Sequence, residues 1–153
     1  MGSYIENELK GKTSYRELGE WVLEQDSQIA RHGSARLIEL AYEKQDFDWA
    51  VDYVNKFVTQ SKSEADSRSV VVSLAKLMIK EDPRDAMKWG VTIPEDTPGK
   101  HTVLVKAFSA LNQKDRNASL AMIKLVRSEE TRKSLLSIDQ HLENRRLQNA
   151  KKD

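Results

Sequence analysis

Residues 82–89 read DPRDAMKW and carry the clearest helix-start signal in the chain. Asp82 suits the position just before a helix, because its carboxylate can accept a hydrogen bond from a free backbone N–H. Pro83 suits the first helical position, where no N–H is needed. The segment therefore predicts a short helix that begins at Pro83, includes Trp89 and ends before the loop around Pro94.

A similar start recurs on both sides of this helix. The tripeptides at residues 44–46, 80–82 and 113–115 lie about 36 and then about 33 residues apart, a spacing typical of helical-hairpin repeats. After each aspartate comes a small residue and, later in the helix, two bulky ones. The small residues are Ala50, Ala86 and Ala118, and the bulky pairs are Tyr53 and Phe57, Trp89 and Ile93, and Met122 and Val126. The chain therefore contains an internal repeat.

Apolar residues recur at helical spacing through most of the remaining chain. Ser14 and Glu17 have the spacing of a capping box and predict a first helix, which we expect Gly33 to stop. Ser34 would then cap the second helix. The later helices are expected to begin at Asp46, Ser63, Asp82, shortly before Val103, at Asp115 and at Ser128. Residues 70–72 and 103–105 are short β-branched runs, but they lie inside helix-length segments and are assigned to helices.

These patterns predict an all-α fold of about eight helices, arranged as stacked antiparallel pairs in a short α–α superhelix, or solenoid. One amphipathic hairpin cannot bury its own apolar face, whereas stacked hairpins share a continuous core. We expect residues 14–148 to form this helical-repeat domain, after a polar N-terminal segment at 1–13 and before a polar tail at 149–153.

The repeat resembles the tetratricopeptide-like and related α–α superhelical proteins, especially bacterial repeats in which Asp-Pro-x-x-Ala-x-x-Trp opens each unit. Residues 82–89 match that pattern, residues 46–50 match it without the proline, and residues 115–118 match loosely, with the alanine one position early. The resemblance covers about residues 44–142. It implies a scaffold or partner-binding role, because such arrays rarely carry chemistry themselves.

Composition excludes several classes of protein. The 153 residues include no cysteine, so disulfides, thiolate nucleophiles and cysteine-bound zinc are ruled out. The formal net charge is +1, too small to attract nucleic acid or an anionic membrane at long range. The sequence predicts no membrane association, because no apolar run approaches the length of a spanning helix and no signal peptide is recognisable. A cytoplasmic location is expected, unless residues 1–3 (MGS) are a cloning remnant of a fragment that has lost its targeting signal.

The reactive side chains of the sequence form no pattern that predicts an active site. His32, His101 and His141 lie on different elements without a second ligand one helical turn away. Gly33 and Gly99 are isolated, so no phosphate-binding loop is predicted. Three aspartates, at 46, 82 and 115, occupy equivalent repeat boundaries and are interpreted as helix caps. We expect no catalytic residue, no cofactor and no metal, and therefore not an enzyme.

The leading hypothesis is a groove, lined by the first helices of the repeats, that binds a peptide or helix of a partner protein. Its expected contacts are Trp49, Tyr53, Trp89 and Lys88. The alternative is nucleic-acid binding through the basic last helix. That alternative would use Arg132, Lys133, Arg145 and Arg146. A third hypothesis is self-association, in which copies extend the stack end to end.

Overall fold

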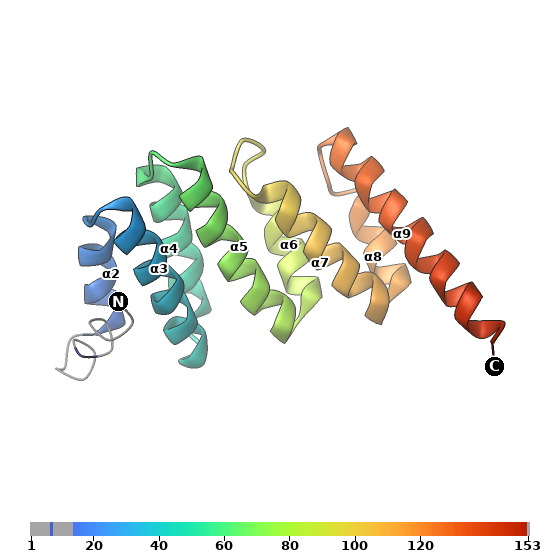
Figure 1. The fold of residues 1–153 in the computed structure, drawn as a ribbon, viewed down its shortest axis with the longest axis horizontal. Coiled ribbons are helices and arrows are strands. Elements are labelled where there is room, and N and C mark those ends of the chain that lie inside the picture. Colours follow the sequence, from blue (N-terminus) through green and yellow to red (C-terminus); the bar gives the residue numbers. More distant parts are fainter. Residues whose placement is uncertain (1–6, 8–13, 153) are drawn as a thin grey trace. The chain divides into compact units, whose positions relative to one another are not determined.

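The computed structural model describes residue 7 and residues 14–152, and every regular element in these residues is an α-helix (Figure 1). The predicted N-terminal segment lies outside the described residues except for Asn7. The eight helices are α2 (Tyr15–Leu23), α3 (Ser27–Glu43), α4 (Phe47–Gln60), α5 (Glu64–Glu81), α6 (Pro83–Thr92), α7 (Lys100–Lys114), α8 (Arg116–Ile123) and α9 (Glu129–Ala150). The expected all-α fold is confirmed, and the runs 70–72 and 103–105 lie within α5 and α7.

Most predicted helix starts are capped as expected. Ser14 and Glu17 form a reciprocal capping box at α2, and Asp115 accepts a hydrogen bond from the Ala118 N–H at 2.9 Å. At α6, the Asp82 carboxylate accepts from the Arg84 N–H at 2.8 Å, and Pro83 occupies the first turn. Ser63 and Ser128 cap α5 and α9 in the same way.

Asp46 precedes α4 as predicted, but its side chain does not cap the helix. The carboxylate instead accepts hydrogen bonds from the Tyr15 hydroxyl and from the Arg16 guanidinium. The charged hydrogen bond to Arg16 is stronger than one to a neutral backbone N–H, which accounts for this choice.

The predicted boundary at Gly33 is wrong. Helix α2 ends ten residues earlier, and the Asp26 carboxylate caps α3 by accepting from the Ile29 N–H at 3.1 Å. A lone glycine costs a helix only about 1 kcal/mol relative to alanine, and the burial of Leu37 and Ile38 outweighs that cost. Ser34 accordingly lies inside α3, where it is buried and does not cap a helix.

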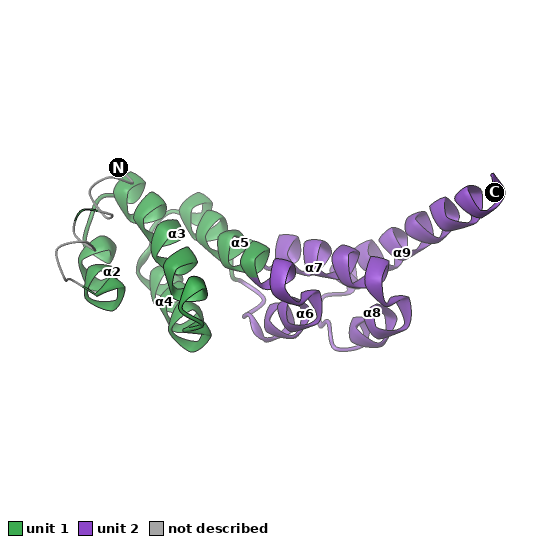
Figure 2. Ribbon diagram, turned by 90° about the horizontal axis from the view of Figure 1, so that it is seen from below, with its two compact units in different colours: residues 1–77, 97–99 green, residues 78–96, 100–153 purple. Residues whose placement is uncertain are grey.

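The chain divides into two compact units, and Figure 2 shows α2, α3 and α4 in one and α6, α7, α8 and α9 in the other. Unit 1 comprises Met1–Leu77 with Thr97–Gly99, and unit 2 comprises Met78–Asp96 with Lys100–Asp153. In unit 1, α2 packs against α3 and α4, and α3 packs against α4. In unit 2, α6 packs against α7 and α8, and α7 and α8 pack against α9. Helix α5 begins in unit 1, and its last residues belong to unit 2.

Equivalent positions of the repeat have equivalent burial. The fourth residue after the aspartate at each repeat boundary is small and fully buried, at Ala50, Ala86 and Ser119. Ser119 therefore replaces Ala118 as the small residue of the last repeat, because the predicted alanine lies one position off the buried face. Phe57, Ile93 and Val126 are also buried, each eleven residues after its aspartate.

Candidate binding pocket

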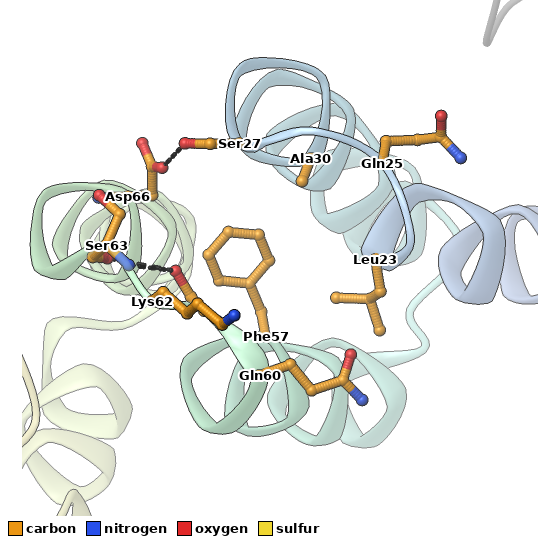
Figure 3. Close-up of a pocket in the computed structure, with 10 residues that line it drawn as sticks. Leu23, Gln25, Ser27, Ala30, Phe57, Gln60, Lys62, Ser63 and Asp66 are labelled. Carbon is orange, nitrogen blue, oxygen red and sulfur yellow. Dashed lines mark hydrogen bonds between the residues drawn. The ribbon is translucent and has the colours of Figure 1, made fainter.

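A pocket of about 350 Å³ lies in unit 1, where the turns that follow α2 and α4 meet the first turns of α3 and α5 (Figure 3). Short turns bring these four helix ends together, because α3 begins soon after α2 ends and α5 begins soon after α4 ends. The lining residues are Leu23, Gln25, Ser27, Ala30, Phe57, Gln60, Ser61, Lys62, Ser63 and Asp66.

The inner surface of the pocket is apolar. Ala30 and Leu23 lie on one side of the Phe57 ring, and Ser63 and Asp66 lie on the other (Figure 3). Phe57 and Ala30 are buried, and Leu23 is half-buried. Phe57 points inward because it continues the apolar stripe of α4 that begins with Ala50. This surface offers an apolar group contacts that exclude water.

Hydrogen-bonding groups surround this apolar surface. The Gln25 amide donates to the Trp21 carbonyl at 2.9 Å, which leaves its own carbonyl oxygen available. Gln60 is exposed at the end of α4, and its side-chain amide has no hydrogen-bond partner in the described part of the chain. Ser61 and Ser63 hydrogen-bond to each other in the turn before α5, which holds that wall of the pocket in place.

One wall contains a buried carboxylate whose charge is already compensated. Asp66 is 6% exposed, and it accepts a hydrogen bond from the Ser27 hydroxyl. The Arg31 guanidinium lies 3.5 Å from its other oxygen. Lys62 is exposed and forms no ion pair within the described residues. The uncompensated charge among the lining residues is therefore positive.

The structure places two of the predicted contact residues, Trp49 and Tyr53, in an aromatic cluster between α2 and α4. Trp49 stacks on Tyr53 with ring centres 4.8 Å apart and meets the Tyr15 ring edge-on at 5.0 Å. Both rings of the stacked pair also lie where a Cβ atom at Gly19 would meet them. Trp49 is half-buried, so part of its ring remains accessible.

Tyr53, one of the predicted partner contacts, is buried, and its side chain is only 4% exposed. The Tyr53 hydroxyl forms a 2.9 Å hydrogen bond with the Ser34 hydroxyl, and burial raises the pKa of Tyr53 to about 12. Tyr53 thus links α3 to α4 inside the core.

The other two predicted contacts, Lys88 and Trp89, lie on α6 in unit 2 and do not line the pocket. Lys88 is exposed and lies 3.6 Å from the Asp85 carboxylate, and Trp89 is half-buried. The four predicted residues therefore belong to two different units, with two in unit 1 and two in unit 2.

Three of the four predicted nucleic-acid contacts are engaged within α9 or with its neighbours. Arg132 donates to the Val126 carbonyl at 2.8 Å, and Lys133 lies 3.2 Å from Glu129. Arg146 donates to the Asn112 carbonyl and to Glu143. Arg145 is exposed and has no such partner in the described chain. Most of these cations therefore serve contacts within the protein.

Sequence reasoning missed the pocket. The pattern of residues 59–64 predicts only a turn, and nothing in it pairs Ser27 with Asp66, which lie 39 residues apart. The one available signal was Asp66 itself, a charged residue that follows Ser63 by one helical turn and lies on the buried side of α5.

Three observations bear on function. No helix in the described residues is both long and apolar enough to cross a membrane. The same residues contain no group of three or more histidine, aspartate or glutamate side chains that could hold a metal ion. Comparisons with protein-family models, curated proteins and solved structures found no match. The functional assignment therefore depends on the geometry of this chain.

Proposed function

We propose that this protein is a non-catalytic interaction module that binds a peptide or a helix of a partner protein. The observation that supports this function best is the pocket in unit 1, which combines the apolar surface of Phe57 with exposed amide groups. Pockets of this kind bury an anchoring side chain while polar groups orient the bound backbone.

The architecture of the chain also supports this role. Within each unit, packed helices provide a scaffold, and the turns between them carry side chains that can contact a partner. The resemblance to tetratricopeptide-like arrays implies the same use of the fold. We extend the proposal to a reducing compartment such as the cytoplasm, which suits a chain without cysteine.

A peptide-display selection on the full chain tests this function. We expect enrichment of related short sequences that bind in solution with micromolar to millimolar affinity, as is usual for a contact of this size. Failure to enrich any sequence over an empty surface would contradict the proposal. The control selection uses the same chain unfolded in urea, which should enrich nothing in common with the folded chain.

The nucleic-acid alternative receives less support, because most of the predicted cations of α9 are engaged in contacts within the protein. Binding through phosphates strengthens steeply as salt falls. Because most of these cations are already engaged, we expect a labelled single-stranded oligonucleotide not to bind even at low salt, where phosphate contacts are strongest.

A further inference from the structure

We propose that the unit 1 pocket holds one apolar side chain of the bound peptide, of leucine or phenylalanine size, with an acidic residue next to it. This inference rests on the proposed peptide-binding function and specifies which part of the partner is recognised. It is drawn from the volume of the pocket, the chemistry of its inner surface and the charges of its lining residues.

The volume limits the size of the occupant. At about 350 Å³ the pocket lies at the small end of the range for ligand sites, which begins at about 300 Å³. One large side chain with part of its backbone fits such a space, whereas a complete helix face does not. The pocket therefore accommodates the side chain of a single anchor residue.

The inner surface defines the chemistry of that anchor. Leu23, Ala30 and Phe57 have side chains of carbon alone, so a polar side chain would lose its hydrogen bonds to water without replacement. Gln25 and Gln60 lie on the two sides of Leu23, where their amide groups can bond to the backbone on either side of an anchor (Figure 3).

The charges of the lining residues define the charge of the peptide residue next to the anchor. The Asp66 carboxylate already has Ser27 and Arg31 as partners, so its charge does not select a cation in the peptide. Lys62 is exposed and has no acidic partner among the described residues, and an acidic side chain beside the anchor would give it one. A basic residue at that place would be repelled.

The test is a titration of the full ¹⁵N-labelled chain with acetyl-Ala-Leu-Glu-Ala-amide up to about 10 mM, since millimolar affinity corresponds to only about 4 kcal/mol. We expect saturable amide shifts in residues 25–30 and 57–66, which surround the pocket. Replacing the peptide leucine with alanine should weaken binding about tenfold or more, because the buried methyl groups are lost. Replacing the peptide glutamate with lysine should weaken it several-fold.

Two protein variants probe the same contacts. Ala30→Leu fills the pocket and should weaken binding at least about tenfold, with helicity checked by circular dichroism. Lys62→Glu changes an exposed side chain and should reverse the preference, favouring the lysine peptide over the glutamate peptide. Lys76→Glu is the matched control, because Lys76 is an exposed residue of α5 that does not line the pocket.

The outcomes separate this inference from the proposed function. Absence of saturable shifts, or shifts confined to other residues, would overturn the inference. Equal binding of the leucine and alanine peptides, or no effect of Lys62→Glu, would also overturn it. If peptides from the display selection bind but ignore Ala30→Leu, the interaction function stands and only the pocket assignment fails.

Discussion

Asp139 on α9 shows how one residue can tie three helices of unit 2 together. Its carboxylate accepts hydrogen bonds from Arg116 on α8 at 2.8 and 3.0 Å, and from Asn112 on α7 at 2.8 Å. These bonds, chiefly those from Arg116, hold the pKa of the Asp139 carboxyl below its ordinary value of 3.8. The ionised form is therefore the one that stabilises the folded chain.

This arrangement predicts a specific pH dependence. Because the folded-state pKa lies below the unfolded value, the stabilisation is complete above the unfolded pKa and is lost as the pH falls through the folded pKa. Asp139→Asn should lower the free energy of unfolding at pH 7 by about 1 kcal/mol, a value reduced because Arg116 is partly exposed. The variant should also lose less stability than the parent below about pH 4.

Urea midpoints measured from pH 7 down to about pH 2 check this prediction. The matched control is Asp52→Asn, because Asp52 is exposed on α4 and its carboxylate has no hydrogen-bond partner among the described residues. Identical acid sensitivity of the Asp139→Asn variant and the parent would refute the role of this carboxylate.

Gln45, between α3 and α4, is the one non-glycine residue of the described chain with a left-handed backbone, at φ 59°. The backbone hydrogen bonds from Gln45 N to Tyr42 O and from Asp46 N to Ala41 O form a Schellman motif at the end of α3. Glycine is the usual residue at the position that Gln45 occupies in this motif. Gln45→Gly should therefore raise the free energy of unfolding by up to about 1 kcal/mol. Denaturant midpoints measure the change, and Gln45→Ala, which keeps a Cβ, should give no comparable gain.

At the scale of the helix, repeated contacts define the register of neighbouring pairs. In unit 1, Arg16 in the first turn of α2 reaches Asp46, which precedes α4, at 2.5 Å. In unit 2, Arg84 in the first turn of α6 reaches Asp115, which precedes α8, at 3.3 Å. Each bridge joins an arginine in the first turn of one pair's first helix to the aspartate that precedes the first helix of the next pair. Because their arginines are exposed, each contributes at most about 1 kcal/mol, but together they mark the repeat.

Gly19 allows α2 and α4 to approach closely. A Cβ atom at Gly19 would lie 2.9 Å from Trp49 Cζ2 and 3.0 Å from Tyr53 Cε2, inside normal contact distance. Gly19→Ala should thus lower the free energy of unfolding by about 1 kcal/mol, because overpacking costs about 1–3 kcal/mol and better helix propensity returns about 1 kcal/mol.

A double-mutant cycle with Trp49→Leu tests this steric cause. Leucine lacks the ring atom nearest to position 19, so Gly19→Ala should cost less in the Trp49→Leu background than in the parent. Equal costs in the two backgrounds would show that the aromatic contact is not responsible.

At the scale of the molecule, stability is expected to be distributed over pairs of helices. Each compact unit contains its own buried side chains, such as Leu37 in unit 1 and Leu135 in unit 2, both fully buried. In an array of this kind, stability is approximately a sum of intrinsic terms for each pair and of terms between neighbours. A defect should then weaken the pairs around it most.

Leu37→Ala should lower the free energy of unfolding of unit 1 by about 2–5 kcal/mol, because it leaves a cavity in a closed core. Hydrogen exchange followed residue by residue should show the largest loss of protection in α2, α3 and α4 and the smallest in α9. Leu135→Ala should give the reverse pattern. Uniform loss of protection through the whole chain would contradict this distributed stability.

The helix starts could be predicted because a cap joins atoms only two or three residues apart. Asp82, Asp115, Ser63 and Ser128 all accept from backbone groups just ahead of them, so the signal is present in any short window of sequence. The helical repeat was visible for a similar reason, since each pair carries its own apolar period.

Tertiary packing determined everything that depends on contacts between helices. Gly33 and Ser34 form a helix interior because the buried faces of α3 outweigh a weak local break, and Tyr53 is buried because Ser34 accommodates its hydroxyl. The pocket likewise depends on Ser27 and Asp66, which are distant in sequence and meet only after the helices have packed. A short window of sequence cannot predict such contacts between helices, because their free energy comes from burial shared between elements.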